Sequence, residues 1–282
     1  MKKIAAMLLC IMTVTVVGGC GSTNNADSNT DSNTENAGNT TEKLIVGMEL
    51  AYPPFETKDE EGNAMGISVD FSEAFGEYLG REVVIENIAW DGLIPALQTG
   101  KVDMVISSMT ITDEREEVVD FSIPYANAML ALLTNKDSGI ESIEDMNAPG
   151  KKIAVKTGST GYFYAEGNLP EAEIIALPDE SACVTEVSQG RADGFIYDQL
   201  TIYRNWQNNP ETTGAVFIPF QEVDKWGVAV QDGNTELLEQ LNAFIEEYTA
   251  DGGFEELTEK YLKEEKEAFD ELGFKWFFDL SE

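Results

Sequence analysis

The sequence contains no histidine, few cysteines and few basic residues. Without an imidazole, the chain cannot use a histidine general base or a histidine metal ligand. Its 18 lysines and arginines are outnumbered by 52 aspartates and glutamates, and the formal net charge is −34. A surface with this much negative charge repels the phosphate backbone of nucleic acids. Nucleic acid is therefore excluded as a partner.

The cysteines are Cys10, Cys20 and Cys183. We expect Cys10 to be removed with an N-terminal segment and Cys20 to be modified, which leaves Cys183 without a disulfide partner. Cys183 also lacks the histidine that usually activates a catalytic thiol. Because it lies in an apolar helical pattern with Val184 and Val187, we expect it to be a buried structural residue.

The N-terminal apolar run from Ile4 to Val17 follows two lysines. It is too short to span a bilayer but suits the apolar region of a signal peptide. The run ends in VGGC, which resembles a bacterial lipobox, in which cleavage precedes the cysteine and the new N-terminus is lipidated. We therefore expect residues 1–19 to be a signal peptide and Cys20 to carry lipid at the outer face of the cytoplasmic membrane. An ordinary secretory cleavage site is the alternative.

Residues 21–42 consist almost entirely of Ser, Thr, Asn, Asp, Ala, Glu and Gly. A segment of this composition cannot bury enough apolar surface to offset the entropy lost on ordering. We expect residues 20–42 to be the lipidated cysteine followed by a disordered tether, and the folded body to start at Lys43.

Strand and helix patterns alternate after Lys43. A buried strand reads LIVGMEL, and a helical pattern from Val69 to Leu79 ends at Gly80, a natural C-terminal cap. A second strand, Val83 to Ile88, precedes a helix from Asp91 to Thr99. This alternation predicts an α/β fold with a parallel sheet covered on both faces.

Two pairs of segments indicate an internal repeat. Residues 97–107, LQTGKVDMVIS, match residues 187–197, VSQGRADGFIY, because each is a helix end, a capping glycine, a cation, an apolar residue, an aspartate and a strand. Residues 43–49 match residues 151–158 more loosely. The chain therefore contains two similar α/β lobes.

The apolar run at residues 125–134 is long enough to cross from one lobe to the other, and residues 226–230 can cross back. Two crossings make the first lobe discontinuous, with residues 43–130 and 228–282, and leave residues 131–227 for the second. Lobes joined in this way close about a hinge.

The carboxyl ends of the matched strands carry polar residues of both charges. Ligands of open parallel sheets bind beyond these ends. If the lobes face each other, the side chains line one cleft. They are Glu49, Ser107, Ser108, Lys156 and Asp198.

The segment VISSMTITDER, residues 105–115, is typical of a buried strand, a polar turn and a helix start. Thr112 or Asp113 would cap the helix, with Glu116 completing a capping box. Hydroxyls and free N–H groups converge in such a turn, and Arg115 can bind a carboxylate through two parallel hydrogen bonds. A capped helix with a surface arginine is the structural alternative.

An arginine and an aspartate at a fixed separation can bind the two opposite charges of a zwitterion. Arg115, with Ser108 and Thr110, suits its carboxylate, and Asp198 suits its ammonium. The turn at residues 158–161 could add backbone N–H groups, but it lacks the GK[ST] ending of a phosphate-binding loop. The pattern therefore favours an amino acid over a nucleotide.

Three segments carry a family resemblance: VGMELAYPPFE, WDGLIPALQTGKVDMVISSMTITDEREEVVDFSIPY and KIAVKTGSTGYFYA. They resemble the polar amino-acid branch of the bacterial solute-binding proteins of ABC transporters, family 3, from about Lys43 to Leu262. The resemblance implies a two-lobed, periplasmic-binding-protein-like (type II) fold with two hinge crossings. It also implies a monomeric receptor, without metal, cofactor or catalytic residues, that delivers a free amino acid to a membrane permease.

The resemblance implies roles for individual residues. Arg115 would bind the α-carboxylate with Thr110 and Thr160, while Ser108 and Asp198 would hold the α-ammonium. The full set of implied ligand contacts is Glu49, Tyr52, Trp90, Ser107, Ser108, Thr110, Arg115, Lys156, Thr160 and Asp198.

The expected side-chain pocket combines aromatic rings with opposite charges. Tyr52 and Trp90 would enclose the ligand's aliphatic stem, with core packing as the alternative. Glu49 stands where family members usually have aspartate, and Lys156 matches a lysine of glutamine-binding members. Opposite charges favour a neutral side chain with a donor and an acceptor, such as that of glutamine. Alternatively, Glu49 and Lys156 pair with each other and say little about the ligand.

The sequence leaves two other functions and the role of the C-terminal segment undecided. Glu49 and Asp198 could serve as acid and base in a dehydratase on the same fold, or the chain could be a ligand-sensing module. After a charged helix at residues 263–267, the tail has aromatic residues at five of ten positions. This tail is either a strap across a lobe or a contact for the permease.

Overall fold

A computed structural model describes residues 42–217 and 222–280. The expected signal peptide, Cys20 and all of the expected tether except Glu42 lie outside the described residues. Among the helices in these two ranges, none has the length and the apolar composition that a bilayer crossing requires.

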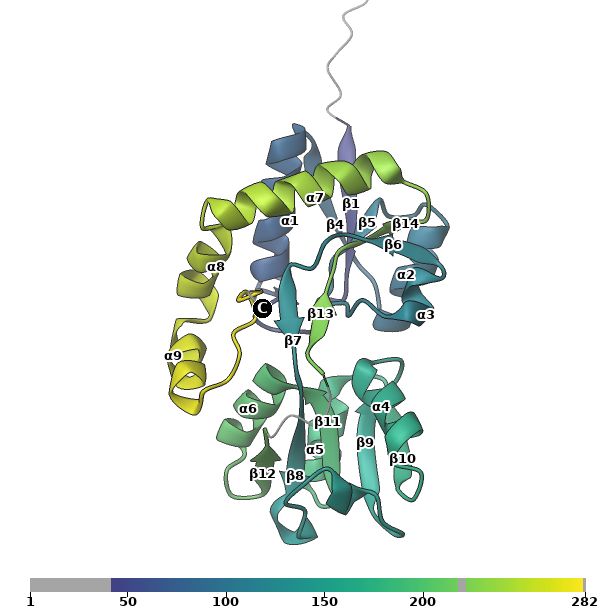
Figure 1. Ribbon diagram of the computed structural model, residues 1–282, viewed down its shortest axis with the longest axis vertical. Helices are drawn as coiled ribbons and strands as arrows, with labels where there is room; N and C mark the ends of the chain where they lie inside the picture. The colour runs from purple at the N-terminus through teal and green to yellow at the C-terminus, as the bar shows by residue number, and fades with distance from the viewer. Residues whose placement is uncertain (1–41, 218–221, 281–282) are drawn as a thin grey trace, which may run out of the picture. The chain divides into compact units, whose positions relative to one another are not determined.

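Lobe 1 is built on a five-stranded sheet with the order β4-β1-β5-β14-β6 (Figure 1). Its strands are β1 (Lys43–Met48), β4 (Glu82–Asn87), β5 (Met104–Val105), β6 (Val119–Phe121) and β14 (Ala229–Gln231). Its helices are α1 (Ile67–Leu79), η1 (Trp90–Gly92), α2 (Leu93–Gln98), α3 (Asp113–Glu116), α7 (Thr235–Ala250) and α8 (Gly253–Tyr261). A short hairpin, β2 (Thr57–Lys58) and β3 (Ala64–Met65), precedes α1.

Lobe 2 is built on a second five-stranded sheet with the order β10-β9-β11-β8-β12. Its strands are β8 (Leu130–Asn135), β9 (Lys152–Lys156), β10 (Glu173–Leu177), β11 (Gly194–Asp198) and β12 (Thr213–Val216). Its helices are η2 (Lys136–Ser138), η3 (Glu144–Met146), α4 (Thr160–Asn168), α5 (Glu180–Ser188) and α6 (Gln199–Asn208).

Both sheets are mixed, which corrects the expectation of purely parallel sheets. In lobe 1, β14 runs antiparallel to β5 and β6, and in lobe 2, β8 runs antiparallel to β11 and β12. The reason lies in the connections. Strands β8 and β14 each follow a crossing from the other lobe, so they run away from the cleft, while the parallel strands run toward it. The ends of the parallel strands still meet at the cleft.

The two predicted crossings are present. Strand β7 (Ala126–Ala128) continues into β8 of lobe 2, and β13 (Asp224–Trp226) continues into β14 of lobe 1. The expected single strand over residues 125–134 is interrupted at Met129, between β7 and β8. β7 and β13 pair antiparallel with each other, so the hinge is a two-stranded ribbon.

The internal repeat has a structural role in both lobes. Gly100 and Gly190 adopt left-handed backbone conformations, with φ of 70° and 67°. The repeated aspartate then binds a neighbouring parallel strand of its own lobe. Asp103 accepts a hydrogen bond from Ile45 N on β1 at 2.7 Å, and Asp193 accepts one from Lys152 N on β9 at 2.8 Å. The two aspartates therefore fix equivalent strands in the two lobes.

The helix α1 illustrates how the sequence fixes the core of lobe 1. Ile67, Phe71 and Phe75 recur every four residues and are buried, so one face of the helix covers the sheet. The helix ends at Gly80, which has φ of 66° and donates its backbone N–H to the Glu77 carbonyl, as predicted.

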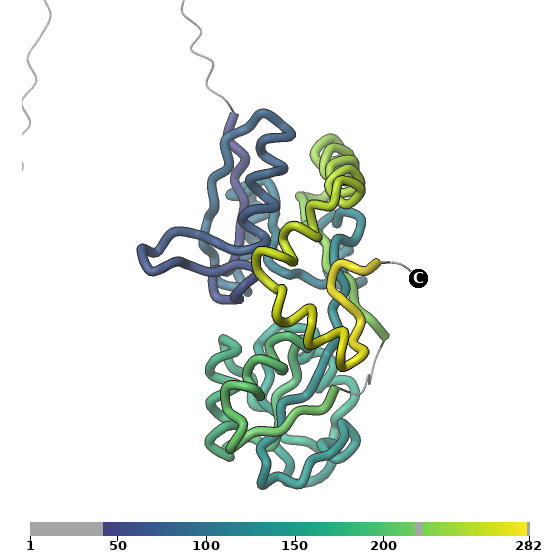
Figure 2. The backbone as a smooth tube through the Cα atoms, turned by 90° about the vertical axis from the view of Figure 1, so that its left-hand side faces the viewer, coloured from purple at the N-terminus to yellow at the C-terminus, as the bar shows by residue number. Residues whose placement is uncertain are grey.

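The C-terminal extension, residues 263–280, contacts both lobes. It begins with α9 (Lys263–Leu272), whose Phe269 is buried in the core of lobe 1 with Phe277. Figure 2 shows α9, in yellow, beside the green helix α6 of lobe 2. There Glu265 accepts a hydrogen bond from Arg204 Nε at 2.8 Å, and the rings of Phe269 and Tyr203 meet edge to face at 5.6 Å. The extension therefore packs on lobe 1 and also contacts lobe 2, so it does not lie across one lobe alone.

Candidate functional site

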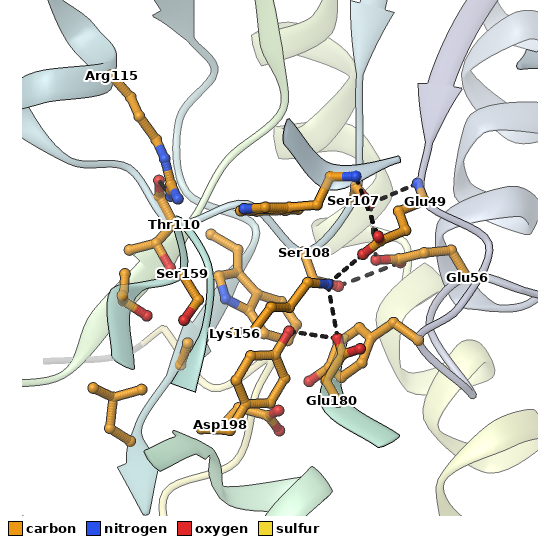
Figure 3. A pocket seen from close by; sticks show the side chains of 17 residues that line it. Glu49, Glu56, Ser107, Ser108, Thr110, Arg115, Lys156, Ser159, Glu180 and Asp198 are labelled. Atoms are coloured by element: carbon orange, nitrogen blue, oxygen red, sulfur yellow. Dashed lines mark hydrogen bonds and ion pairs between the residues drawn. The ribbon is translucent and has the colours of Figure 1, made fainter. Parts of the chain in front are cut away.

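The ten predicted ligand contacts all line one pocket between the lobes (Figure 3). Lobe 1 contributes those from Glu49 to Arg115, and lobe 2 contributes Lys156, Thr160 and Asp198. Sequence reasoning missed part of the lining. The missed residues are Glu56, Ala128, Leu130, Ser159, Glu180, Tyr197 and Trp226.

Arg115 is buried, with 8% of its surface exposed, and is not the surface arginine of the structural alternative. Thr112 is the N-cap of α3, and its hydroxyl accepts from Arg115 N at 3.4 Å. Arg115 is therefore the third residue after the cap, where a capping box has glutamate or glutamine, so the predicted box with Glu116 is wrong. The Arg115 side chain lines the pocket.

The Arg115 guanidinium joins the lobes. It donates from Nη1 to the Thr110 carbonyl at 2.6 Å, within lobe 1, and from Nη2 to the Gly158 carbonyl at 3.2 Å, in lobe 2. It also lies over the Trp90 ring, 5.3 Å from the centroid. Burial lowers the pKa of Arg115 to about 10, so the group stays charged at neutral pH. Carbonyl oxygens and the Trp90 ring therefore contact this buried cation, and the charges of Asp224 and Glu114 also favour it.

Asp198 is the C-terminal residue of β11 and the N-cap of α6. Its Oδ1 accepts from the backbone N–H groups of Leu200 and Thr201 at 2.9 and 3.1 Å, which fixes the carboxylate. Its Oδ2 is buried and has no hydrogen-bond partner among residues 42–217 and 222–280. Burial raises the pKa of this carboxyl group, although the neighbouring hydroxyls of Tyr52 and Thr201 lower it. An unpartnered acceptor in a pocket wall suits an ammonium group.

Lys156 is almost fully buried and forms two ion pairs. Its ammonium pairs with Glu49 of lobe 1 and, at 3.0 Å, with Glu180 at the start of α5. Burial lowers the pKa of Lys156, but the two carboxylates outweigh this effect, so its pKa is raised. Glu49 is fixed as well, because its Oε1 accepts from Trp90 N at 3.1 Å. Glu49 and Lys156 therefore pair with each other, and Glu180 adds a third charge that the sequence did not reveal.

A turn of two serines follows β5 and faces Glu56. Ser107 Oγ accepts from Glu49 N at 3.0 Å, so it ties this turn to the end of β1. Ser108 has φ of 49°, a left-handed conformation that is unfavourable for a serine. Both hydroxyls lie near Glu56, at 3.4 and 3.3 Å from its carboxylate oxygens.

Tyr52 and Trp90 differ in how they contribute to the pocket. Tyr52 is mostly core, since its ring stacks on Phe55 at 5.3 Å and meets Trp226 edge to face at 6.1 Å. Trp90 is half-buried, and its indole N–H donates to the Gly158 carbonyl of lobe 2 at 3.2 Å. The Lys156 ammonium also lies over its ring, 5.2 Å from the centroid. Trp90 is therefore a platform under two cations.

The turn at residues 158–161 leads into α4. Gly158 has φ of 70°, and a side chain there would approach the Trp90 indole. Ser159 caps the helix by accepting from Tyr162 N at 3.2 Å, and Thr160 is the first helical residue. Ser159 and Thr160 of this helix start line the pocket.

Glu180 and Glu56 escaped sequence reasoning for different reasons. Glu180 follows the N-cap Asp179, where an acidic residue is explained by the helix dipole alone. Glu56 follows an aromatic turn and precedes a charged hairpin, which has no periodicity to mark a buried position. The available sequence signal for Glu56 was the pair of prolines at residues 53 and 54, because a tight turn there brings residues 52 and 56 together, and the structure shows an antiparallel bridge between them.

Two lobes, two hinge strands and an inter-lobe pocket with a buried guanidinium and a fixed carboxylate define a class of two-lobed proteins with a polar binding pocket between the lobes. The chain belongs to the bacterial extracellular solute-binding proteins, family 3, whose model matches residues 44–264. The C-terminal extension lies almost wholly beyond the matched residues.

Several relatives bind amino acids. The chain is 28% identical over 257 residues to the L-cystine-binding protein TcyJ of Escherichia coli (strain K12), with 90% of this chain and 94% of the relative covered. It is 33% identical over 227 residues to the L-arginine-binding protein of Pseudomonas aeruginosa, with 77% and 86% covered. These relatives are binding proteins and not enzymes.

Solved structures give the same fold. An ancestral arginine-binding protein bound to glutamine superposes with a TM-score of 0.71 at 36% identity, covering 78% of this chain and 97% of that one. The ancestral amino acid-binding protein AncCDT-1, a precursor of cyclohexadienyl dehydratase, has a TM-score of 0.72 at 37% identity, with 78% and 94% covered.

Proposed function

We propose that this chain is the extracytoplasmic receptor of an ABC importer and that it closes its lobes around one polar amino acid for delivery to the permease. In this proposal the moving bodies are residues 43–130 with 228–282 and residues 131–227. Signal-peptide removal, lipidation of Cys20 and action as a monomer belong to the same proposal.

The observation that carries the proposal is the pairing of two complementary groups in one pocket. The Arg115 guanidinium is buried and donates to carbonyl oxygens, with the carboxylates of Asp224 and Glu114 acting on it electrostatically. Asp198 Oδ2 is buried without a hydrogen-bond donor among the described residues. An α-amino acid can place its carboxylate at Arg115 and its ammonium at Asp198. Further hydrogen bonds to the two charged groups of the ligand would come from Ser107, Ser108, Thr110 and Thr160.

Our first candidate for the side chain is a neutral amide such as that of glutamine. Lys156 directs two of its three N–H bonds to Glu49 and Glu180, so one donor is left for a carbonyl oxygen. The carboxylate oxygens of Glu49 can accept from an amide nitrogen. Glutamine bound to an ancestral relative agrees with this choice.

A cationic side chain is the second candidate, and Glu180 is the observation that favours it. Two carboxylates and one ammonium leave the Glu49, Lys156 and Glu180 cluster with one net negative charge. A buried net charge is costly, and a guanidinium or ammonium on the ligand would neutralise it. The arginine-binding relatives agree with this alternative.

Calorimetric titration of the purified protein with each of the twenty amino acids tests both parts of the proposal. Tight binding of glutamine supports the amide, whereas tight binding of arginine or lysine without glutamine replaces it by the cationic ligand. The absence of binding by any amino acid contradicts the receptor function. Recovery of the bound amino acid unchanged distinguishes a receptor from a dehydratase.

A further inference from the structure

Glu56 is a buried carboxyl group in the pocket wall that the proposed function leaves without a role. None of its surface is exposed. Its backbone is fixed by two hydrogen bonds to Tyr52, at 2.8 and 3.0 Å. Its Oε2 accepts from the Ser68 hydroxyl on α1 at 2.6 Å, and its two oxygens lie within 3.4 Å of the Ser107 and Ser108 hydroxyls. Hydroxyl groups therefore surround it on both sides.

The charged groups around Glu56 leave it without a cation of its own. Lys156, the lysine of the pocket, pairs with Glu49 and Glu180. Arg115 donates to the carbonyl groups of Thr110 and Gly158. The other titratable residues that line the pocket are Tyr52, Tyr197 and Asp198, and Tyr125 also lies near Glu56. Burial therefore dominates and raises the pKa of Glu56 to about 8, although the three serine hydroxyls and Lys156 lower it.

An amino acid would change this balance. Ser108 and Asp198, which our proposal assigns to the α-ammonium, line the same pocket as Glu56. Ser108 donates to Glu56, so an ammonium held at Ser108 arrives next to this carboxyl group. A new positive charge in a buried site favours the ionised carboxylate.

We propose that Glu56 has two roles. It is a positioning residue that fixes the turn of Ser107 and Ser108, and it ionises and releases a proton when the α-ammonium of an amino acid binds. The step rests on the proposed function. In this step the carboxyl O–H bond of Glu56 breaks and the proton passes to the buffer. The resulting carboxylate pairs with the ammonium group of the ligand. The unfavourable backbone conformation of Ser108 is held by the same hydroxyl contact.

The test is calorimetric titration of the full chain with L-glutamine and, separately, L-arginine, in two buffers that differ in ionisation enthalpy. The parent protein is expected to release close to one proton at about pH 7, seen as a buffer-dependent heat. Its affinity should rise by up to about tenfold per pH unit between about pH 6 and 8, and level off above that range. The sign follows because proton release is favoured by a lower proton concentration.

Matched variants identify the source of the proton. Glu56→Gln keeps a hydrogen-bonding group beside the serines but has no proton to lose, so buffer dependence and the rise with pH should both disappear. Glu73→Gln changes an exposed glutamate on α1 and should behave as the parent does. Ser68→Ala removes the shortest hydrogen bond to Glu56, so the rise in affinity should shift to higher pH.

Two results overturn the inference. One is an equal binding heat of the parent in both buffers, and the other is a buffer dependence that persists in Glu56→Gln. If Glu56→Gln does not fold, an unshifted pH profile of Ser68→Ala contradicts the inference by itself. Failure of the proposed function looks different, because then the parent gives no binding heat with any amino acid in either buffer.

Discussion

The ammonium of Lys156 lies 3.0 Å from a carboxylate oxygen of Glu180, and both residues belong to lobe 2. The pair that Lys156 forms with Glu49 connects different lobes. In the hinge motion that we propose, the first pair would persist when the lobes separate, whereas the second would be broken. Glu180 would then hold Lys156 in both arrangements, and Glu49 would favour the closed one.

Replacing Lys156 tests the charge balance of the pocket. In Lys156→Gln the carboxylates of Glu49 and Glu180 lose their shared cation, so a cationic side chain becomes the better partner. We expect the affinity ratio of arginine to glutamine to rise about tenfold or more, equivalent to about 1.4 kcal/mol, as measured by calorimetry. Lys152→Gln, at a half-exposed lysine of the same strand, is the control, and an unchanged ratio in Lys156→Gln would contradict the assignment.

Arg115 is the proposed carboxylate anchor. Arg115→Ala removes the cation that an amino-acid carboxylate would meet in a buried pocket, and we expect a loss of about 2 to 5 kcal/mol in binding free energy. Arg191→Ala, at an exposed arginine paired with Glu186, should leave binding unchanged. If the first variant binds amino acids as tightly as the parent in calorimetry, the site is misassigned.

Phe269 tests the C-terminal extension. Its ring is fully buried and contacts Tyr203, Phe274, Trp276 and Phe277, so Phe269→Ala should lower the free energy of unfolding by about 3 to 5 kcal/mol. Denaturant titration measures the loss.

Leu272→Ala, at an exposed position of the same helix, serves as the control for Phe269→Ala. Deleting residues 263–282 should lower the melting temperature for the same reason. A deletion that keeps its melting temperature but abolishes uptake would instead identify the extension as a permease contact.

Cys183 should be inert in the folded protein. Burial raises its pKa to about 12, so the reactive thiolate is scarce at about pH 8 and becomes more abundant only as pH rises toward that value. In a chain with Cys10→Ser and Cys20→Ser, a thiol reagent should label one group in urea and almost none in native buffer. Rapid labelling of the native protein would show that Cys183 is accessible.

More of the binding-site residues than of the surrounding fold could be predicted from the sequence. Arg115 and Asp198 were identifiable because each stands where a strand meets a helix, and such junctions have local signatures. The repeated aspartates, Asp103 and Asp193, likewise marked two lobes. Sheet direction was not accessible in this way, because the antiparallel course of β8 and β14 follows from which lobe each strand enters.

Glu56 and Glu180 show the limit more sharply. Each has an ordinary local explanation, as part of a charged turn or as the acidic start of a helix. Their burial results from contacts with Ser68 on α1 and with Lys156 on β9, which are distant in sequence. A single sequence cannot reveal such long-range contacts, whereas the spacing within one turn or one helix end can be read directly.

The Trp90 indole, which donates to Gly158 across the cleft and lies under two cations, is a natural optical reporter. Separating the lobes removes that hydrogen bond and changes the charges beside the ring, so the emission of Trp90 should change in wavelength and intensity. The chain has four tryptophans, and Trp206→Phe, Trp226→Phe and Trp276→Phe would leave one emitter. Hinge motion could then be followed in real time by fluorescence without an attached dye.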